Sequence, residues 1–91
     1  MREVLDEIKE EARRVSFRYG PPTSTQESLG VLVEEVDELK DAIRANSREE
    51  IIQEAVQVAA AAYRLARECS SNNERFLARS GLLRIAPKEA A

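Results

Sequence analysis

The chain has 91 residues, of which 14 are basic and 17 acidic, and it contains no histidine and one cysteine. Without histidine it has no Ser-His-Asp triad, no Cys-His pair and no imidazole metal ligand, and one thiol does not build a zinc cluster. Any catalysis by this chain must therefore depend on carboxylates.

The first predicted helix covers about residues 2–17. Its apolar side chains recur at helical spacing, which is typical of an amphipathic helix. These side chains are Val4, Leu5, Ile8, Ala12 and Val15. The helix is expected to end before Gly20-Pro21-Pro22, the one strong break in the chain.

A second helix is predicted to run to about Ala45. Thr23 or Ser24 caps it, because Gln26 and Glu27 respectively follow three residues later and complete a capping box. Its apolar positions repeat at alternating spacings of three and four, which predicts the seam of a left-handed helical bundle. These positions are Leu29, Leu32, Val36, Leu39 and Ile43.

Ser47, with Glu50 three residues later, caps a third helix that reaches about Ser70. The connection is short, so the second and third helices are expected to lie antiparallel. Residues 55–63 have a single polar side chain, Gln57, and are apolar nearly all round. Such a segment is buried on more than one side and predicts a homo-oligomer interface; the alternative is an exposed alanine-rich helix.

The end of the chain has a weaker pattern. Cys69 is expected to be a small buried apolar residue in a protein of the reducing cytosol. After the polar residues 71–73, a short helix is predicted over residues 74–80, closed by Gly81. Residues 82–85 either pack on a neighbouring subunit or are partly disordered.

Together these elements predict an all-α fold, an antiparallel helical bundle completed by homo-oligomerisation. One domain is expected over residues 1–91, with its core in residues 2–70 and a short helix and tail in residues 71–91. A chain of this length buries only about 60–70% of its unfolded surface, so a monomer would be marginally stable. No run of 18 apolar residues occurs, and residues 1–11 alternate in charge, so we expect a cytoplasmic protein without a membrane span.

Charge is divided unevenly along the chain. Residues 1–26 hold five bases and five acids, residues 27–54 three and nine, and residues 55–91 six and three. An acidic middle argues against a nucleic-acid-binding surface, which needs a basic stripe. It indicates either a solvated helical face or a site for a divalent cation.

Five acids are crowded into the second predicted helix, namely Glu34, Glu35, Asp37, Glu38 and Asp41. At 100° per residue, Glu35 and Glu38 border the apolar face. Asp37 and Asp41 point nearly opposite that face, and Glu34 lies nearer the exposed side. Only Glu35 and Glu38 therefore have to be paired, neutralised or bound to a cation.

On the third helix Glu54 and Gln57 repeat the spacing of Glu35 and Glu38. Antiparallel packing would bring both pairs together across the seam. Two carboxylates about 4 Å apart repel by roughly 4 kcal/mol at an effective dielectric constant near 20. A cluster of three therefore favours a bound hard cation, Mg²⁺ or Mn²⁺, because its ligands are all oxygens.

Two segments carry a family resemblance. Glu34-Glu35-Val36-Asp37-Glu38, followed after fifteen residues by Glu54-Ala55-Val56-Gln57, resembles the EExxE and ExxD motifs of the MazG-like all-α nucleoside triphosphate pyrophosphohydrolases. The similarity covers about residues 27–66 and is greatest to the short bacterial and phage members. In that family the motif acids bind Mg²⁺, and an NTP or dNTP is cleaved to a nucleoside monophosphate and pyrophosphate. The family forms homodimers or homotetramers.

The resemblance implies metal ligation by Glu35, Glu38 and Glu54, with Gln57 in the fourth place. Gln57 offers an amide oxygen but no charge, so the site is expected to hold Mg²⁺ more weakly. A water activated by the metal would attack the triphosphate, and Glu34 or Glu38 would accept its proton. Basic residues are candidates for phosphate binding and aromatic residues for stacking on the base: Arg64, Arg67, Arg75 and Arg79, and Phe17, Tyr19 and Tyr63.

The sequence is also compatible with two rival functions. Gln57 favours a non-catalytic or vestigial MazG-like module that serves in interaction or regulation. A nucleic-acid-binding helical dimer is opposed by the acidic middle segment. The expected partners are therefore a nucleoside triphosphate and further copies of the chain, with no nucleic acid and no membrane.

Overall fold

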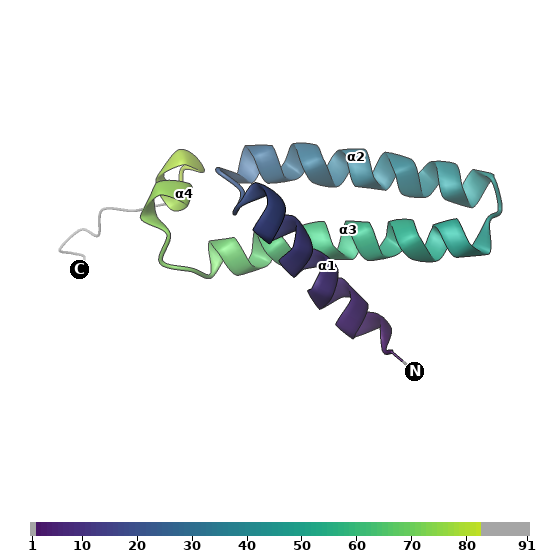
Figure 1. The fold of residues 1–91 in the computed structure, drawn as a ribbon. Helices are drawn as coiled ribbons and strands as arrows, with labels where there is room; N and C mark the ends of the chain where they lie inside the picture. The colour runs from purple at the N-terminus through teal and green to yellow at the C-terminus, as the bar shows by residue number, and fades with distance from the viewer. Residues whose placement is uncertain (1, 83–91) are drawn as a thin grey trace.

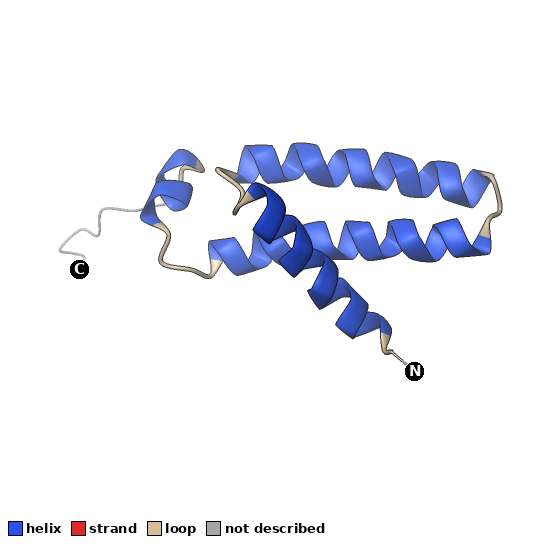
Figure 2. Ribbon diagram, in the orientation of Figure 1, coloured by secondary structure: helices blue, strands red, loops and turns tan. Residues whose placement is uncertain are grey.

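The computed structural model describes residues 2–82, and these form helices and loops without a strand (Figures 1 and 2). The helices are α1 (Val4–Tyr19), α2 (Thr25–Arg44), α3 (Arg48–Cys69) and α4 (Glu74–Arg79). Figure 1 shows α2 and α3 side by side and antiparallel, with α1 crossing α3 obliquely and α4 at one end of the pair. The all-α prediction is confirmed for the described residues. None of their helices has the length and apolar character needed to cross a membrane.

Serine side chains begin the two long helices, as predicted. Ser24 Oγ accepts a hydrogen bond from the Glu27 backbone N–H at 3.1 Å, and Ser47 Oγ accepts one from the Glu50 N–H at 3.3 Å. Of the two proposed caps of α2, Ser24 is therefore the one used. Thr23 instead donates its N–H and its hydroxyl to Glu27 Oε1, at 2.7 and 2.9 Å. These bonds satisfy N–H groups that a helix leaves without internal partners.

Residues that tolerate a positive φ end α1 and α2 and begin the turns that follow them. Gly20, at φ 76°, ends α1 before the two prolines. Asn46, at φ 59°, ends α2, and the Ser47 N–H then reaches back to the Ala42 carbonyl at 3.3 Å. This turn folds α3 directly back along α2. As predicted, Gly81 follows the end of α4, while residues 83–85 lie outside the described part of the chain.

The core is thin and centred on α3, which packs against α1, α2 and α4. The buried apolar side chains of the described residues are Ala12, Ala42, Val56, Ala60 and Phe76. Most are small, which permits close helix approach but removes little apolar surface from water. The radius of gyration is 15.9 Å, against about 12 Å for a compact chain of this length. One copy alone therefore has an elongated shape and a small core.

The predicted seam of α2 is only partly correct. Three of its five apolar residues are exposed, Leu29 to 58%, Val36 to 38% and Ile43 to 54%. The other two are half-buried, and the fully buried positions are Ser28 and Ala42, one residue earlier. The reason is that the apolar face of α2 is wider than one neighbouring helix can cover. α3 packs on its smaller residues and leaves a stripe of larger ones uncovered.

The apolar segment 55–63 is covered on two sides rather than all round. Val56 and Ala60 are buried, where α3 meets its neighbours, whereas Ala55 and Ala62 are exposed. The sequence predicts an oligomer interface for the whole segment, and in one copy of the chain only its exposed side is left uncovered.

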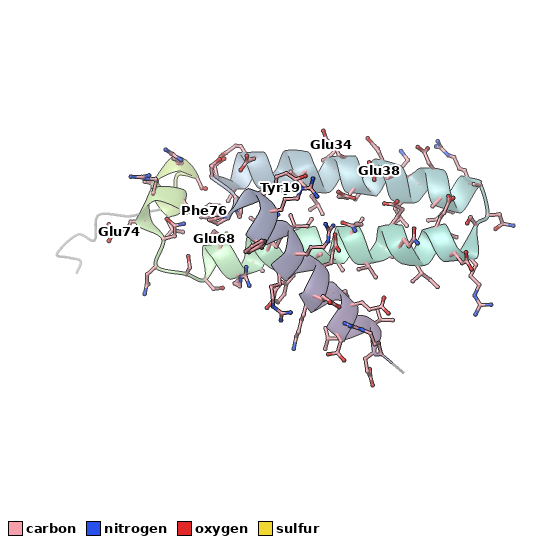
Figure 3. The ribbon with its side chains drawn as sticks, in the orientation of Figure 1. Tyr19, Glu34, Glu38, Glu68, Glu74 and Phe76 are labelled. Carbon is pink, nitrogen blue, oxygen red and sulfur yellow. The ribbon has the colours of Figure 1, made fainter. Side chains whose placement is uncertain are left out.

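The prediction that Cys69 is buried is wrong, because Cys69 is exposed. The preceding residue, Glu68, turns inward instead and is only 9% exposed. Its carboxylate accepts a hydrogen bond from Asn73 Nδ2 at 2.7 Å, close to the fully buried Phe76 of α4 (Figure 3). This polar contact ties the end of α3 to Asn73, the residue that caps α4, and Cys69 faces solvent beside it.

Candidate metal and substrate site

Three acidic side chains of α2 and α3 converge. Glu35, Glu38 and Glu54 each have a carboxylate oxygen within 4.8 Å of the others. The turn at Asn46 sets this register, because Glu38 and Glu54 each lie eight residues from Asn46 (46 − 38 and 54 − 46), and Glu35 and Gln57 each lie eleven. Residues at equal distances from a tight turn lie at the same level of two antiparallel helices, and those on the facing sides come together.

The carboxylates in this cluster lack compensating charge. No described salt bridge involves Glu35, Glu38 or Glu54. The cations of α2 lie beside other acids, with Lys40 Nζ 4.0 Å from Asp37 and an Arg44 nitrogen 4.0 Å from Asp41. One oxygen of Glu54, Oε1, is buried without a hydrogen-bond partner. A buried oxygen of this kind costs free energy unless it accepts a proton, a hydrogen bond or a cation.

Burial and mutual repulsion shift the acids of the cluster in the same direction. The pKa of Glu54 is raised, first by desolvation and then by the charge of Glu38. The pKa of Glu35 is raised by desolvation, followed by the charges of Glu38 and Glu54. Both groups therefore resist ionisation in the metal-free protein. A divalent cation bound to these carboxylates would favour their ionised form and lower both pKa values.

The remaining predicted catalytic acid, Glu34, is exposed and does not belong to the cluster (Figure 3). Its charge contributes to the raised pKa of Glu35, which follows it in the chain, but less than the charges of Glu38 and Glu54 do. Glu38 is the exposed member of the cluster, whereas Glu35 and Glu54 are half-buried. The geometry therefore separates the two candidate bases that the spacing alone left equivalent.

Gln57 lies opposite Glu35 but is bound to a residue of α1. Its Nε2 donates a hydrogen bond to Glu11 Oε2 at 2.7 Å. Glu11 also accepts two bonds from Arg14, Nε to Oε1 at 3.0 Å and Nη2 to Oε2 at 2.6 Å. The pKa of Glu11 is lowered, chiefly by the hydrogen bond from Arg14 and further by Gln57, against the opposing effect of burial.

Sequence reasoning missed Glu11. The available signal is its position on α1, three residues after Ile8 and four before Val15, which places an acid on the apolar face. Arg14 follows three residues later, at a spacing that favours an ion pair. An acid in this position with its own cation indicates a polar contact with another helix.

A pocket of about 480 Å³ lies next to the cluster. It opens between α1, the α1–α2 connection, the start of α2 and the middle of α3, and its volume is within the range of small-molecule sites. Glu35, a member of the cluster, lines the pocket together with Gln57. Other walls are formed by Glu11, Tyr19, Thr23 and Arg64.

The two arginines predicted to hold substrate differ in position. Arg64 lines the pocket, where its Nε donates to Ser16 Oγ at 3.0 Å and its Nη2 to the Gly20 carbonyl at 2.8 Å. Arg67 does not line this pocket; its guanidinium lies over the ring of Tyr63, 5.6 Å from the centroid.

Of the aromatic candidates, Tyr19 lines the pocket, whereas Phe17 is 94% exposed and Tyr63 is 38% exposed outside it. Arg75 and Arg79 line a separate hollow beside the prolines of the α1–α2 connection.

No protein-family model matches the chain, and comparison with curated proteins and with solved structures returned no match.

Proposed function

We propose that the protein is a Mg²⁺-dependent nucleoside triphosphate pyrophosphohydrolase that converts an NTP or dNTP to the nucleoside monophosphate and pyrophosphate. The observation that carries the proposal is the convergence of Glu35, Glu38 and Glu54 beside a pocket of about 480 Å³. The resemblance of these residues to the MazG-like motifs supplies the reaction. The three acids were selected by spacing, and their oxygens lie within 4.8 Å of one another.

The residues fit Mg²⁺, with Mn²⁺ as a substitute. All donors are carboxylate or amide oxygens, which is the set that hard cations prefer. Glu54 Oε1 is buried without a partner, and the repulsion that raises the pKa values of Glu35 and Glu54 would be relieved by a positive charge. Bound Mg²⁺ would supply charge to neutralise the phosphates and would lower the pKa of a coordinated water.

Side chains of the protein would accept the proton, bind a phosphate and stack on the base. Glu38 would accept the proton of the water; its exposure within the cluster supports it over Glu34, which lies outside the cluster. Arg64 lines the pocket and provides a guanidinium for a phosphate. Tyr19, in the same wall, offers a ring against which the base can stack.

A panel of NTPs and dNTPs, assayed for pyrophosphate at millimolar Mg²⁺ or Mn²⁺, tests the proposal. Turnover of at least one nucleotide is expected, with equimolar monophosphate and pyrophosphate as products and complete loss in EDTA. Release of inorganic phosphate and a diphosphate instead would contradict the reaction type. Lack of turnover with every nucleotide would leave a non-catalytic interaction or regulatory module as the function.

We further propose that the active form is a homodimer or homotetramer in which a second copy covers the apolar stripe of α2. The stripe consists of Leu29, Val33, Val36 and Ile43, each between 38% and 58% exposed. A chain with so thin a core gains stability by burying this surface, at about 25 cal/mol per Å².

Sedimentation analysis tests the oligomer. The wild-type protein is expected at twice or four times its 10.2 kDa chain mass. Val36→Glu should shift it to the monomer, because a second copy would have to bury the new charge without a partner. Asp37→Glu, at a neighbouring exposed position, should leave the mass unchanged. A wild-type monomer at micromolar concentration would refute the proposed oligomer.

A further inference from the structure

The nitrogen of the Gln57 side-chain amide is hydrogen-bonded, whereas its oxygen is not hydrogen-bonded to any described residue. Its nitrogen donates to Glu11 at 2.7 Å. Its oxygen accepts no hydrogen bond from the part of the chain that the structure describes. An amide rotated by 180° would turn its oxygen towards the carboxylate of Glu11, where two acceptors would repel. Glu11 therefore fixes which end of the amide remains available on α3.

Gln57 lies near the carboxylate cluster. It lies opposite Glu35 in the α2–α3 hairpin, three residues after Glu54, and shares the pocket wall with Glu35. Gln57, Glu54 and Glu11 also line a second hollow of about 380 Å³ between α1 and α3. The contact between Glu11 and Gln57 therefore lies at the edge of the carboxylate cluster.

The surroundings of Glu11 are those of a fixed support rather than of a ligand. Its side chain is 15% exposed, and both of its oxygens accept from Arg14. It is not one of the three residues whose oxygens converge. The Arg14 guanidinium forms an ion pair with Glu11 and keeps its carboxylate ionised, so Gln57 donates to a charged acceptor. A hydrogen bond from the amide N–H to a carboxylate also polarises the amide and makes its oxygen a stronger ligand for a cation.

We propose that Glu11 is a positioning residue of the metal site, which holds the Gln57 amide with its oxygen available to the cation. This inference rests on the proposed function. It explains how a neutral side chain serves in a place where the resembling family has an acid. The amide oxygen is oriented and polarised by a carboxylate on another helix, and α1 becomes part of the metal site through one side-chain hydrogen bond.

The proposal is tested by the affinity for Mn²⁺, measured by electron paramagnetic resonance of free Mn²⁺ without substrate. Loss of an outer partner of a metal ligand typically costs about 10–100-fold in affinity, and we expect Glu11→Gln to weaken Mn²⁺ binding about tenfold. Glu10→Gln, an exposed neighbour on α1 paired with Arg2, should leave the affinity unchanged.

Exchange of the two side chains provides a rescue. The double variant Glu11→Gln/Gln57→Glu keeps an amide-to-carboxylate hydrogen bond between the helices but places the charge on α3. It should bind Mn²⁺ at least as tightly as the wild type, because a carboxylate at position 57 offers the cation a charged oxygen. Wild-type affinity in Glu11→Gln, or equal weakness in the single and double variants, would overturn the proposal.

The same titrations separate this inference from the proposed function. If the wild type does not bind Mn²⁺, the metal site and its positioning residue fail together. If binding is lost in Glu54→Gln but kept in Glu11→Gln, the metal site stands and only the role of Glu11 is rejected. Circular dichroism of each variant checks that the helices are intact.

Discussion

Replacing Glu54 by glutamine should reduce pyrophosphate release at least about 100-fold while leaving the helices intact. The estimate is a lower bound, because loss of even an outer partner of a metal ligand costs about 10–100-fold, and Glu54 is proposed to bind the cation directly. The side chain keeps its size, but its buried oxygen loses the charge that a cation would neutralise. Steady-state rates over a range of Mg²⁺ concentrations give the measurement.

The fold should survive this change because the carboxylate is unfavourable in the metal-free protein. The pKa of Glu54 is raised by desolvation and by Glu38. A neutral amide removes that cost at neutral pH. The thermal midpoint without metal should therefore not fall.

Glu49→Gln is the matched control, since it makes the same substitution at an exposed site on α3 outside the cluster. It should retain wild-type turnover. If Glu54→Gln also retained it, the assignment of the metal ligands would be wrong even for an active enzyme.

Local features of this fold were predictable because they depend on neighbouring residues. Ser24 and Ser47 cap their helices through groups three residues away. The turn at Asn46 fixes the pairing of α2 with α3. The convergence of the three acids follows from that pairing and was predictable from helical spacing, whereas their selection as metal ligands came from the motif resemblance.

Contacts between distant segments were not predictable in the same way. α1 crosses α3 at an angle that no sequence period encodes, and the bond between Glu11 and Gln57 depends on that crossing. The choice of Arg64 over Arg67 as a pocket residue has the same origin, because α1 and Gly20 close the pocket around Arg64.

The face of α2 that packs on α3 was predicted incorrectly for a different reason. Leu29 and Val36 fit a bundle seam, yet α3 packs on positions one residue earlier, which include Ser28 and Glu35. A hydrophobic pattern marks apolar side chains that become buried within the same chain and those that become buried against another chain in the same way. In a chain proposed to form an oligomer, it therefore does not reveal which stripe faces the intramolecular neighbour.

Millimolar Mg²⁺ should stabilise the protein by about 2.7 kcal/mol when its concentration is 100 times the dissociation constant. For a domain of this size, that corresponds to an increase in thermal midpoint on the order of 10 °C. The cause is that the folded state gathers three carboxylates that an unfolded chain keeps apart. Scanning calorimetry at fixed protein concentration gives the shift. Glu54→Gln should abolish it, and an equal shift in that variant would place the cation elsewhere.

This Mg²⁺ stabilisation should depend on pH with a defined sign. The pKa values of Glu35 and Glu54 are raised in the folded protein, so between the ordinary glutamate value and the raised values the folded state holds more protons than the unfolded state. Lowering the pH through this window therefore stabilises the metal-free protein and simultaneously protonates the ligands that Mg²⁺ requires. The difference between the unfolding free energies with and without Mg²⁺ should shrink as the pH falls and reach its full value above both raised pKa values. The opposing contribution of Glu11, whose pKa is lowered, is lost only at lower pH and does not mask the trend. A difference that stays constant through the window would show that the cation does not bind these two carboxylates.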